Sequence, residues 1–375
     1  MQMLSILEVI IIILCTIHFA APLTYYVYMK TFLKKPWNVK LDSNYKPKVT
    51  VILPTYNEKE IIEKKLKNFQ SQDYPHDLIE TIVIDSASTN GTPENVEKWV
   101  KKHKDLKIIL IQEKERKGKA HALNNALKHA TGEIVIIADA DAMWPNNAIT
   151  EAVKWLADPT IGAVSCLKKP EQKGPAEIEQ GYRKYYNMLR ISESKAWSTP
   201  IFHGELAAYR KELLDEIGGF PEHIGADDSH SAVKIALLGY RTITPETLWC
   251  TEAIPKKGYH LWRIRRAQHL IQHFLKTGTN KKIPKEFKTI LRMETFLHVV
   301  NPWLLLLIAV LLPVCAIKGS TLSKIFLVSG LALLMVKSYR TWITQQVHLI
   351  AASVRNLKTK EIVWRKDIKY AKKVD

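Results

Sequence analysis

Short apolar runs alternate with helical stretches between residues 30 and 295. The runs at 49–54, 81–85, 107–112 and 133–141 are rich in valine and isoleucine and are each expected to form a strand, with the first one buried. Between them, residues 61–72, 96–103 and 119–130 show helical spacing, and the last of these helices ends at a Thr-Gly pair. This β-α-β-α-β-α-β series predicts an α/β domain with a mostly parallel sheet that helices cover on both faces.

Longer apolar runs lie on both sides of this alternating region. Residues 3–28 are interrupted only by Glu8 and His18 and meet the roughly 20-residue length of a membrane span. Lysines follow this run rather than precede it, which argues against a cleaved signal peptide and places the following domain in the cytoplasm.

Two further apolar runs occupy the C-terminal part of the chain. Residues 298–317 predict a second span, and residues 325–336 a shorter third one. A buried or interfacial helix is the alternative for the third run. The expected organisation is a multi-pass membrane protein with the segments 1–30 (transmembrane helix), 31–255 (cytoplasmic catalytic domain), 256–295 (amphipathic interfacial helices), 296–345 (transmembrane helices) and 346–375 (basic cytoplasmic tail).

Charge and cysteine content narrow the class of protein. The formal net charge is +18, which favours an anionic partner such as a phosphorylated small molecule or anionic lipid. No zinc-finger, basic-zipper or aromatic ribonucleoprotein pattern is present, so we expect no nucleic-acid partner. The four cysteines show no C-x-x-C spacing, and we expect free thiols in a reducing compartment.

Acidic residues follow the predicted strands on one edge of the sheet. Asp85 ends the second strand, and Asp139 and Asp141 end the fourth. Residues two apart in an extended segment point the same way, so both aspartates of the last pair are expected to reach one site. Carboxylate oxygens suit Mg²⁺ or Mn²⁺ better than zinc, and ligands bind at this edge of parallel sheets. A turn that merely ends a strand is the alternative.

Several segments together resemble the membrane-bound family-two glycosyltransferases. They occur in the family's order and cover roughly residues 48–255: VTVILPTYNE, VIDSASTNGT, RKGKAHALNNAL, IADADA, FHGELAAYRKELLDEIGGF and GADDSHSAVKIALLGYRTI. The resemblance implies a GT-A fold and an inverting, metal-dependent transfer of a sugar. The donor would be a nucleotide-diphospho-sugar, with UDP favoured over GDP, and the metal Mg²⁺ or Mn²⁺.

The resemblance also implies roles for individual residues. The nucleotide-sugar would be bordered by Thr55, Tyr56, Glu58, Asp85, Lys119 and Asp139. Asp141, with Asp139 beside it, would hold the metal, and Asp228 would be the general base. Asp227 would lie beside that base, and one of the two is expected to cap the helix that follows. His203 and Gly204 would lie on the acceptor side, where the glycine lets the backbone approach the sugar.

One motif of the processive family members is incomplete. In the segment HLWRIRRAQHLIQHF, Gln268 matches the glutamine of the motif Q-x-x-R-W, but Ile271 and Gln272 stand where the arginine and tryptophan would be. Arg265 and Arg266 remain candidates for contacts to the diphosphate.

Because of this departure, we expect addition of one or a few sugars to a lipid-linked or glycan acceptor. A processive polysaccharide synthase and a non-catalytic scaffold are the alternatives. Arg263 is expected to face lipid phosphate from an interfacial helix. Residues 177–190 are either a membrane-facing helix near the acceptor path or a plain packed helix.

Overall fold

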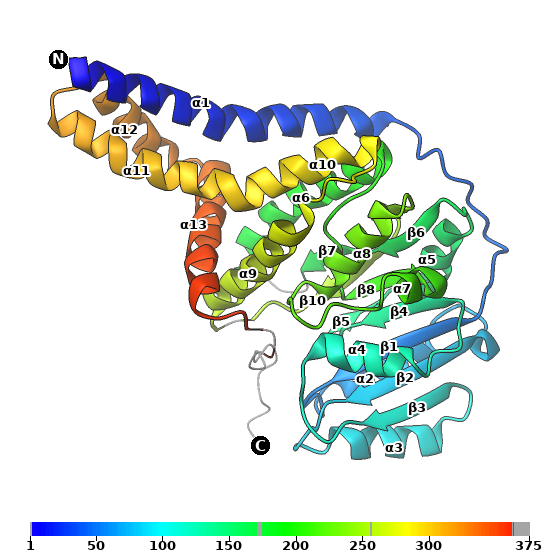
Figure 1. Ribbon diagram of the computed structural model, residues 1–375. Coiled ribbons are helices and arrows are strands. Elements are labelled where there is room, and N and C mark those ends of the chain that lie inside the picture. Colours follow the sequence, from blue (N-terminus) through cyan, green and yellow to red (C-terminus); the bar gives the residue numbers. More distant parts are fainter. Residues whose placement is uncertain (1, 171–174, 256, 362, 364–375) are drawn as a thin grey trace.

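A seven-stranded sheet forms the centre of the protein in the computed structural model, which describes residues 2–170, 175–255, 257–361 and 363 (Figure 1). Its strand order is β3-β2-β1-β4-β8-β6-β9. The strands are β1 (Val49–Thr55), β2 (Ile79–Asp85), β3 (Lys107–Gln112), β4 (Ile134–Ala138), β6 (Ile161–Ser165), β8 (Leu206–Arg210) and β9 (Arg241–Ile243). The four strands expected from the sequence are present, but β4 ends at Ala138 and not at Asp141, and β3, at the edge of the sheet, is only partly buried.

Parallel pairing places the ends of the first four strands at one edge. β1 pairs in parallel with both β2 and β4, and Thr55 stands opposite Asp85 in this register. β8 is the exception, because it runs antiparallel to β4 and to β6. The sheet is therefore mixed but mostly parallel, as expected for this fold class.

Two apolar layers cover the sheet. One face packs against α2 (Ile62–Gln70), α3 (Thr92–Lys102) and α5 (Ala148–Leu156), and the other against α4 (Lys119–Leu127), α7 (Lys211–Glu216) and α8 (Asp227–Leu237). A smaller sheet, in the order β5-β10-β7, joins β5 (Ala142–Met143), β10 (Trp249–Glu252) and β7 (Leu167–Pro170). It lies next to the edge of the main sheet at which the first four strands end, because β5 follows β4 directly.

Long helices extend beyond this domain (Figure 1). α1 (Gln2–Lys30) runs antiparallel to a nearly continuous rod made of α10 (Lys285–Thr295), a π-helical turn η3 (Phe296–Val300) and α11 (Asn301–Ile317). The segments Ile6–Lys34 and Lys285–Ile317 are long and apolar enough to cross a membrane. Many large apolar side chains on their protruding halves are exposed, as a lipid-facing surface requires.

The third apolar run folds differently from a simple span. α12 (Thr321–Leu333) has 13 residues, a length of about 20 Å, which is shorter than the roughly 30 Å hydrocarbon layer. It bends by 103° into α13 (Lys337–Lys358), so the two helices together are a broken span or a re-entrant segment. Residues 346–358, expected in a basic tail, belong to α13, and residues 364–375 of that tail lie outside the described residues.

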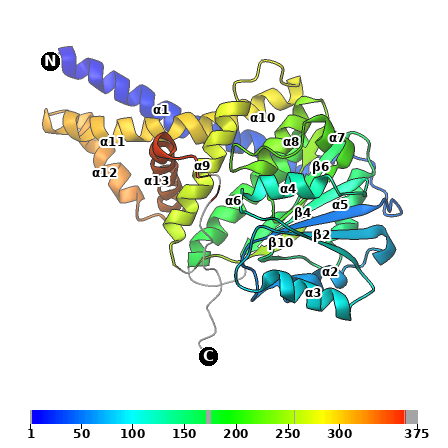
Figure 2. The same ribbon diagram turned by 60° about the horizontal axis from the view of Figure 1, so that its bottom comes forward.

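The helix expected to lie in the headgroup layer is instead largely buried. α9 (Tyr259–Thr277) packs along α13 and against α8, and Figure 2 shows it between the catalytic domain and α13. Arg263 is 7% exposed and donates to Glu179 and Gln345. The expectation that Arg263 faces lipid phosphate is therefore wrong, because a buried guanidinium needs internal acceptors.

Candidate active site

One cavity of about 300 Å³ connects the carboxyl edge of the sheet with the helices that lead to the apolar rod. Thr55, Tyr56 and Glu58 line one end of it. Its far end is lined by side chains of α6 (Pro175–Ala196), α9, η3 and α13. Of the residues expected at the site, Lys119, Asp139, Asp141, His203, Gly204, Asp227, Asp228, Arg265 and Arg266 also line it. Asp85 and Gln268 do not belong to the lining.

The two aspartates after β4 lie on a tight turn. Ala142 N–H donates to the carbonyl oxygen of Asp139 at 3.3 Å, which closes the turn Asp139–Ala142. The segment is therefore not extended, and alternation along a strand is not the reason that both carboxylates reach the cavity. The turn itself brings Asp139 and Asp141 there, and both side chains are half-buried.

Lys119 begins α4 and reaches across to this turn. Its Nζ lies 2.7 Å from Oδ1 of Asp139 and 4.0 Å from Oδ2 of Asp227. Burial alone would lower the pKa of Lys119, but the carboxylates of Asp139, Asp227 and Asp228 outweigh it and raise the pKa above its ordinary value. Lys119 is therefore a permanent cation at the point where the turn Asp139–Ala142 meets the α8 carboxylates.

The backbone of Gly204 lies close to this meeting point. A Cβ at this position would lie 2.8 Å from Nζ of Lys119 and 3.3 Å from Oδ2 of Asp228. Both distances are shorter than ordinary contacts. Any side chain at residue 204 would thus press on the lysine and on the expected base.

The two aspartates at the start of α8 have different surroundings. Oδ1 of Asp228 accepts hydrogen bonds from the backbone N–H and the hydroxyl of Ser229, at 2.6 and 3.2 Å. Asp227 is buried, and its burial raises its pKa to about 7 despite the nearby Lys119. Ala226 occupies the N-cap position and no side chain caps the helix there. Neither aspartate is the N-cap residue, so the expectation that one of them caps the helix is wrong.

The end of the cavity lined by Thr55, Tyr56 and Glu58 contains a residue that the sequence did not single out. The guanidinium of Arg116 lies 3.8 Å from the centre of the Tyr56 ring. Such stacking holds the ring plane in place. Asp85, in contrast, is 2% exposed and accepts from the hydroxyls of Thr55 and Ser88 at 3.0 and 2.6 Å. In this structure Asp85 supports the wall, and its neighbour Ser86 lines the cavity.

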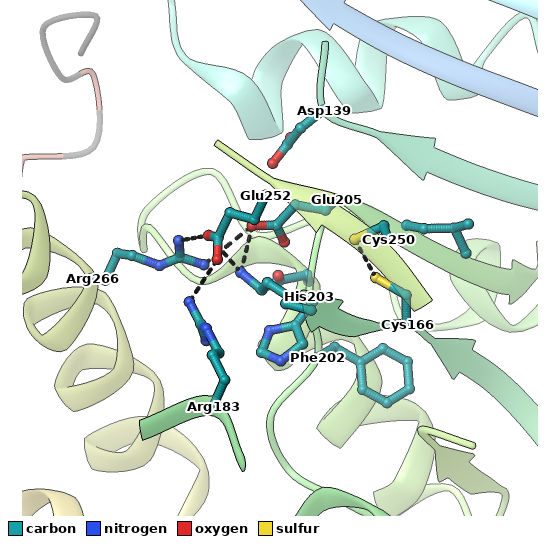
Figure 3. Close-up of polar contacts among 12 residues, drawn as sticks. Asp139, Cys166, Arg183, Phe202, His203, Glu205, Cys250, Glu252 and Arg266 are labelled. Atoms are coloured by element: carbon teal, nitrogen blue, oxygen red, sulfur yellow. Dashed lines mark hydrogen bonds and ion pairs between the residues drawn. The ribbon is translucent and has the colours of Figure 1, made fainter. Parts of the chain in front are cut away.

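Buried ion pairs support the side of the cavity that was expected to face the acceptor (Figure 3). Glu205 and Glu252 share the ammonium of Lys168, which is fully buried, and Arg266 also pairs with both carboxylates. Arg183 of α6 pairs with Glu252 at 2.8 Å. We call Lys168, Arg183, Glu205, Glu252 and Arg266 the ion cluster. Sequence reasoning missed its glutamates, because these partners come from segments far apart along the chain.

The remaining expected residues are placed as follows. His203 is 9% exposed, and burial lowers the pKa of His203 well below its ordinary value, so it is neutral. Arg265 lines the cavity and Arg266 is held by the ion cluster. Gln268 is fully buried and donates to the carbonyl of Thr359, away from the cavity. Gln268 is thus not brought to a diphosphate in this structure.

The donor set fits a divalent ion bound together with a diphosphate. Within the described ranges, no group of three or more His, Cys, Asp or Glu side chains is arranged to hold a metal by itself. Two carboxylates on one turn, opening into a cavity, are what Mg²⁺ or Mn²⁺ uses when phosphate and water supply its other ligands. Asp139 and Asp141 are the residues that would hold such an ion.

The fold and this site define the class of protein. The chain belongs to glycosyl transferase family 2, and the sequence model of that family matches residues 50–218. The fold of the chain is GT-A. It is a glycosyltransferase.

A solved relative matches nearly the whole chain. It is the mannosyltransferase PcManGT from Pyrobaculum calidifontis, whose structure contains GDP-mannose and Mn²⁺. The two chains are 56% identical with a TM-score of 0.87, over 94% of this chain and 99% of that one.

More distant matches are a polysaccharide synthase and a protein that shares the fold alone. Poly-β-1,6-N-acetyl-D-glucosamine synthase of Staphylococcus aureus is 27% identical over 69% of this chain. This chain spans 65% of the length of that synthase. TarS of S. aureus shares the fold, with 19% identity and a TM-score of 0.50 over 85% of this chain and 55% of TarS.

Proposed function

We propose that this glycosyltransferase inverts the anomeric centre of a GDP-linked sugar, GDP-mannose first, in transfer to a hydroxyl of a membrane-associated acceptor. The observation that carries the proposal is the convergence of Lys119, Asp139 and Asp228 at Gly204. The donor assignment is supported by the GDP-mannose bound in the relative that is 56% identical, and it reverses the preference for UDP taken from the sequence.

The residues divide the reaction between two sides of the cavity. On the donor side, Asp139 and Asp141 would hold the divalent ion, which when bound neutralises charge on the leaving diphosphate. Lys119 adds a fixed cation at the same place. On the opposite side, Asp228 would take the proton of the acceptor hydroxyl as that oxygen attacks the anomeric carbon in line with the departing diphosphate.

The acceptor would reach Asp228 along the far end of the cavity. Tyr182, Tyr186 and Arg190 of α6 line this part, with Trp262 of α9 and His348 of α13. Aromatic rings and fixed polar groups are common in sites that hold sugars against an oriented hydroxyl. This arrangement supports the prediction that residues 177–190 lie near an acceptor path.

We further propose that the protein is integral to the membrane, with its catalytic domain in the cytoplasm. His18 and Phe19 of α1 contact Trp342 of α13, with ring centres 4.8 and 5.7 Å apart. Tyr339 lies 6.3 Å from Phe19. Such aromatic groups gather at membrane surfaces, so this level would mark the cytoplasmic interface. Lys30, on the catalytic side of it, agrees with that orientation.

A processive polysaccharide synthase is the second candidate, supported by the 27% identical poly-N-acetylglucosamine synthases. Two positions argue against long products. Ile271, at the arginine position of the processive motif, is 3% exposed, and Gln272, at the tryptophan position, donates to Asn356 at 2.9 Å. Neither side chain lines the cavity.

The test uses the full chain in detergent with radiolabelled GDP-mannose, Mn²⁺ and a membrane lipid extract. We expect label to enter an organic-soluble product that carries one or a few mannoses. Label in a long water-soluble polymer would favour the synthase. Transfer from UDP-N-acetylglucosamine but not from GDP-mannose would contradict the donor assignment.

A further inference from the structure

A buried lysine lies directly behind the metal-ligating turn. Lys65, in the middle of α2, is 0% exposed. Its Nζ donates to the carbonyl oxygen of Ala142, the last residue of the turn Asp139–Ala142. The same atom lies 4.4 Å from the ring centre of Trp144 and 4.8 Å from that of Phe69. A lysine is rarely buried to this extent, so its interactions need a reason.

Lys65 is one of three polar residues on one face of α2 and the turn after it. Asn68 donates to the carbonyl of Trp144 at 2.8 Å and accepts from the N–H of Trp144 at 2.9 Å. Gln72 donates to the carbonyl of Pro145 at 3.0 Å and accepts from the N–H of Ile149 at 3.2 Å. Their spacing of three and four residues places them in one row. This row holds the backbone from Ala142 to Ile149.

Within this row, Lys65 alone contacts the metal-ligating turn. Gln72 holds the backbone three and seven residues beyond the end of that turn, at Pro145 and Ile149, and Asn68 holds Trp144. The indole N–H of Trp144 in turn donates to the carbonyl of Glu205 at 2.8 Å, next to Gly204. Lys65 therefore holds the end of the turn Asp139–Ala142, and Asn68 holds Trp144, which connects the same segment to the backbone next to Gly204.

We propose that Lys65 is a positioning residue for the divalent metal: its buried amine holds the turn Asp139–Ala142 in the conformation that presents Asp139 and Asp141 to the cavity. This inference rests on the proposed function of those two carboxylates. It assigns Lys65 no contact with substrate or metal. Side chains that orient metal ligands through one intervening contact commonly change metal affinity by about 10- to 100-fold when removed.

The experiment measures Mn²⁺ binding to the full-length protein in the presence of GDP, by the electron paramagnetic resonance signal of free Mn²⁺. Lys65→Met keeps the length of the side chain and removes the donor, and we expect about tenfold weaker Mn²⁺ binding. Lys65→Gln retains an N–H donor and should fall between Lys65→Met and the wild type. In turnover assays, Lys65→Met should raise the Mn²⁺ concentration for half-maximal rate more than it lowers the rate at saturating Mn²⁺.

Gln72→Met is the matched control, because it removes buried hydrogen bonds from the same row. We expect Gln72→Met to lower Tm at least as much as Lys65→Met does, while Mn²⁺ binding stays within about twofold of the wild type. Equal Mn²⁺ affinity in Lys65→Met and the wild type would overturn the inference, as would equal weakening in Gln72→Met. A wild-type protein that binds Mn²⁺ with neither GDP nor UDP would overturn the proposed function itself, which is a separate result.

Discussion

Gly204→Ala tests whether the donor-side lysine and the expected base meet at one point. The added methyl would lie 2.8 Å from Nζ of Lys119. An ordinary contact is about 3.5 Å, so the ammonium must move by roughly 0.7 Å. If it moves away from Asp139, their separation of 2.7 Å becomes about 3.4 Å, which is beyond a good hydrogen bond.

The expected loss of activity follows from the strength of the hydrogen bond between Lys119 and Asp139. A hydrogen bond to a charged group contributes about 1.5–3 kcal/mol, which corresponds to roughly 10- to 160-fold in kcat/KM. The fold should be little affected, because Gly204 is not in the left-handed region and the crowded atoms, Nζ of Lys119 and Oδ2 of Asp228, are the ends of side chains. We expect a change in the free energy of unfolding of less than about 1 kcal/mol.

The assay compares kcat/KM for the donor and Tm in Gly204→Ala and Gly181→Ala. Gly181, on α6, has open space where its Cβ would be, so that variant should keep full activity. In a Lys119→Met background, Gly204→Ala should cost less than it does in the wild type. Activity of Gly204→Ala above half that of the wild type would refute the reasoning.

Three further predictions concern individual charges. Lys119→Met should lower kcat/KM by about tenfold or more at saturating Mn²⁺, because Asp139 loses its partner and the diphosphate loses a fixed cation; a rate near that of the wild type would contradict this. Lys168→Met should lower the free energy of unfolding by about 1–3 kcal/mol, since the buried carboxylates of Glu205 and Glu252 lose a shared hydrogen-bond donor and keep only their arginine partners; an unchanged Tm would contradict it. Burial lowers the pKa of Lys65 from 10.5 to about 7, so between these values the unfolded chain binds a proton that the native state lacks. Stability relative to Lys65→Met should therefore rise with pH by at most about 1.4 kcal/mol per unit, and a Tm difference that is the same at pH 7 and pH 9 would contradict this.

The strands and the location of the site could be predicted from the sequence because both depend on local order. Apolar runs of β-branched residues predict buried parallel strands, and parallel strands end at one edge. Asp139 and Asp141 therefore had to lie near that edge. Their conformation could not be predicted, because the turn Asp139–Ala142 is held by Lys65 from a helix some 75 residues earlier in the chain.

The sequence did not predict which charged side chains the fold buries. Lys64 and Lys65 are adjacent in a basic helix. Lys64 is exposed, whereas Lys65 is fully buried because it lies on the side of the helix that faces Ala142. Arg263 was expected at a lipid surface because the sequence does not show which side of its helix the fold buries. Its partner Glu179 lies on α6, and α13 covers both. Long-range packing of this kind leaves no local pattern in the sequence.

The most direct test of the account is donor turnover by the detergent-purified protein. A panel of GDP- and UDP-sugars is assayed with Mn²⁺, with Mg²⁺ and with chelator, alongside Asp141→Ala and Asp228→Asn. We predict Mn²⁺-dependent release of GDP from GDP-mannose. In Asp141→Ala both turnover and Mn²⁺ binding should be lost, whereas Asp228→Asn should lose turnover but still bind Mn²⁺ and GDP. Turnover that persists in chelator or in Asp141→Ala would contradict the assignment of the metal site, and full activity of Asp228→Asn would contradict the assignment of the base.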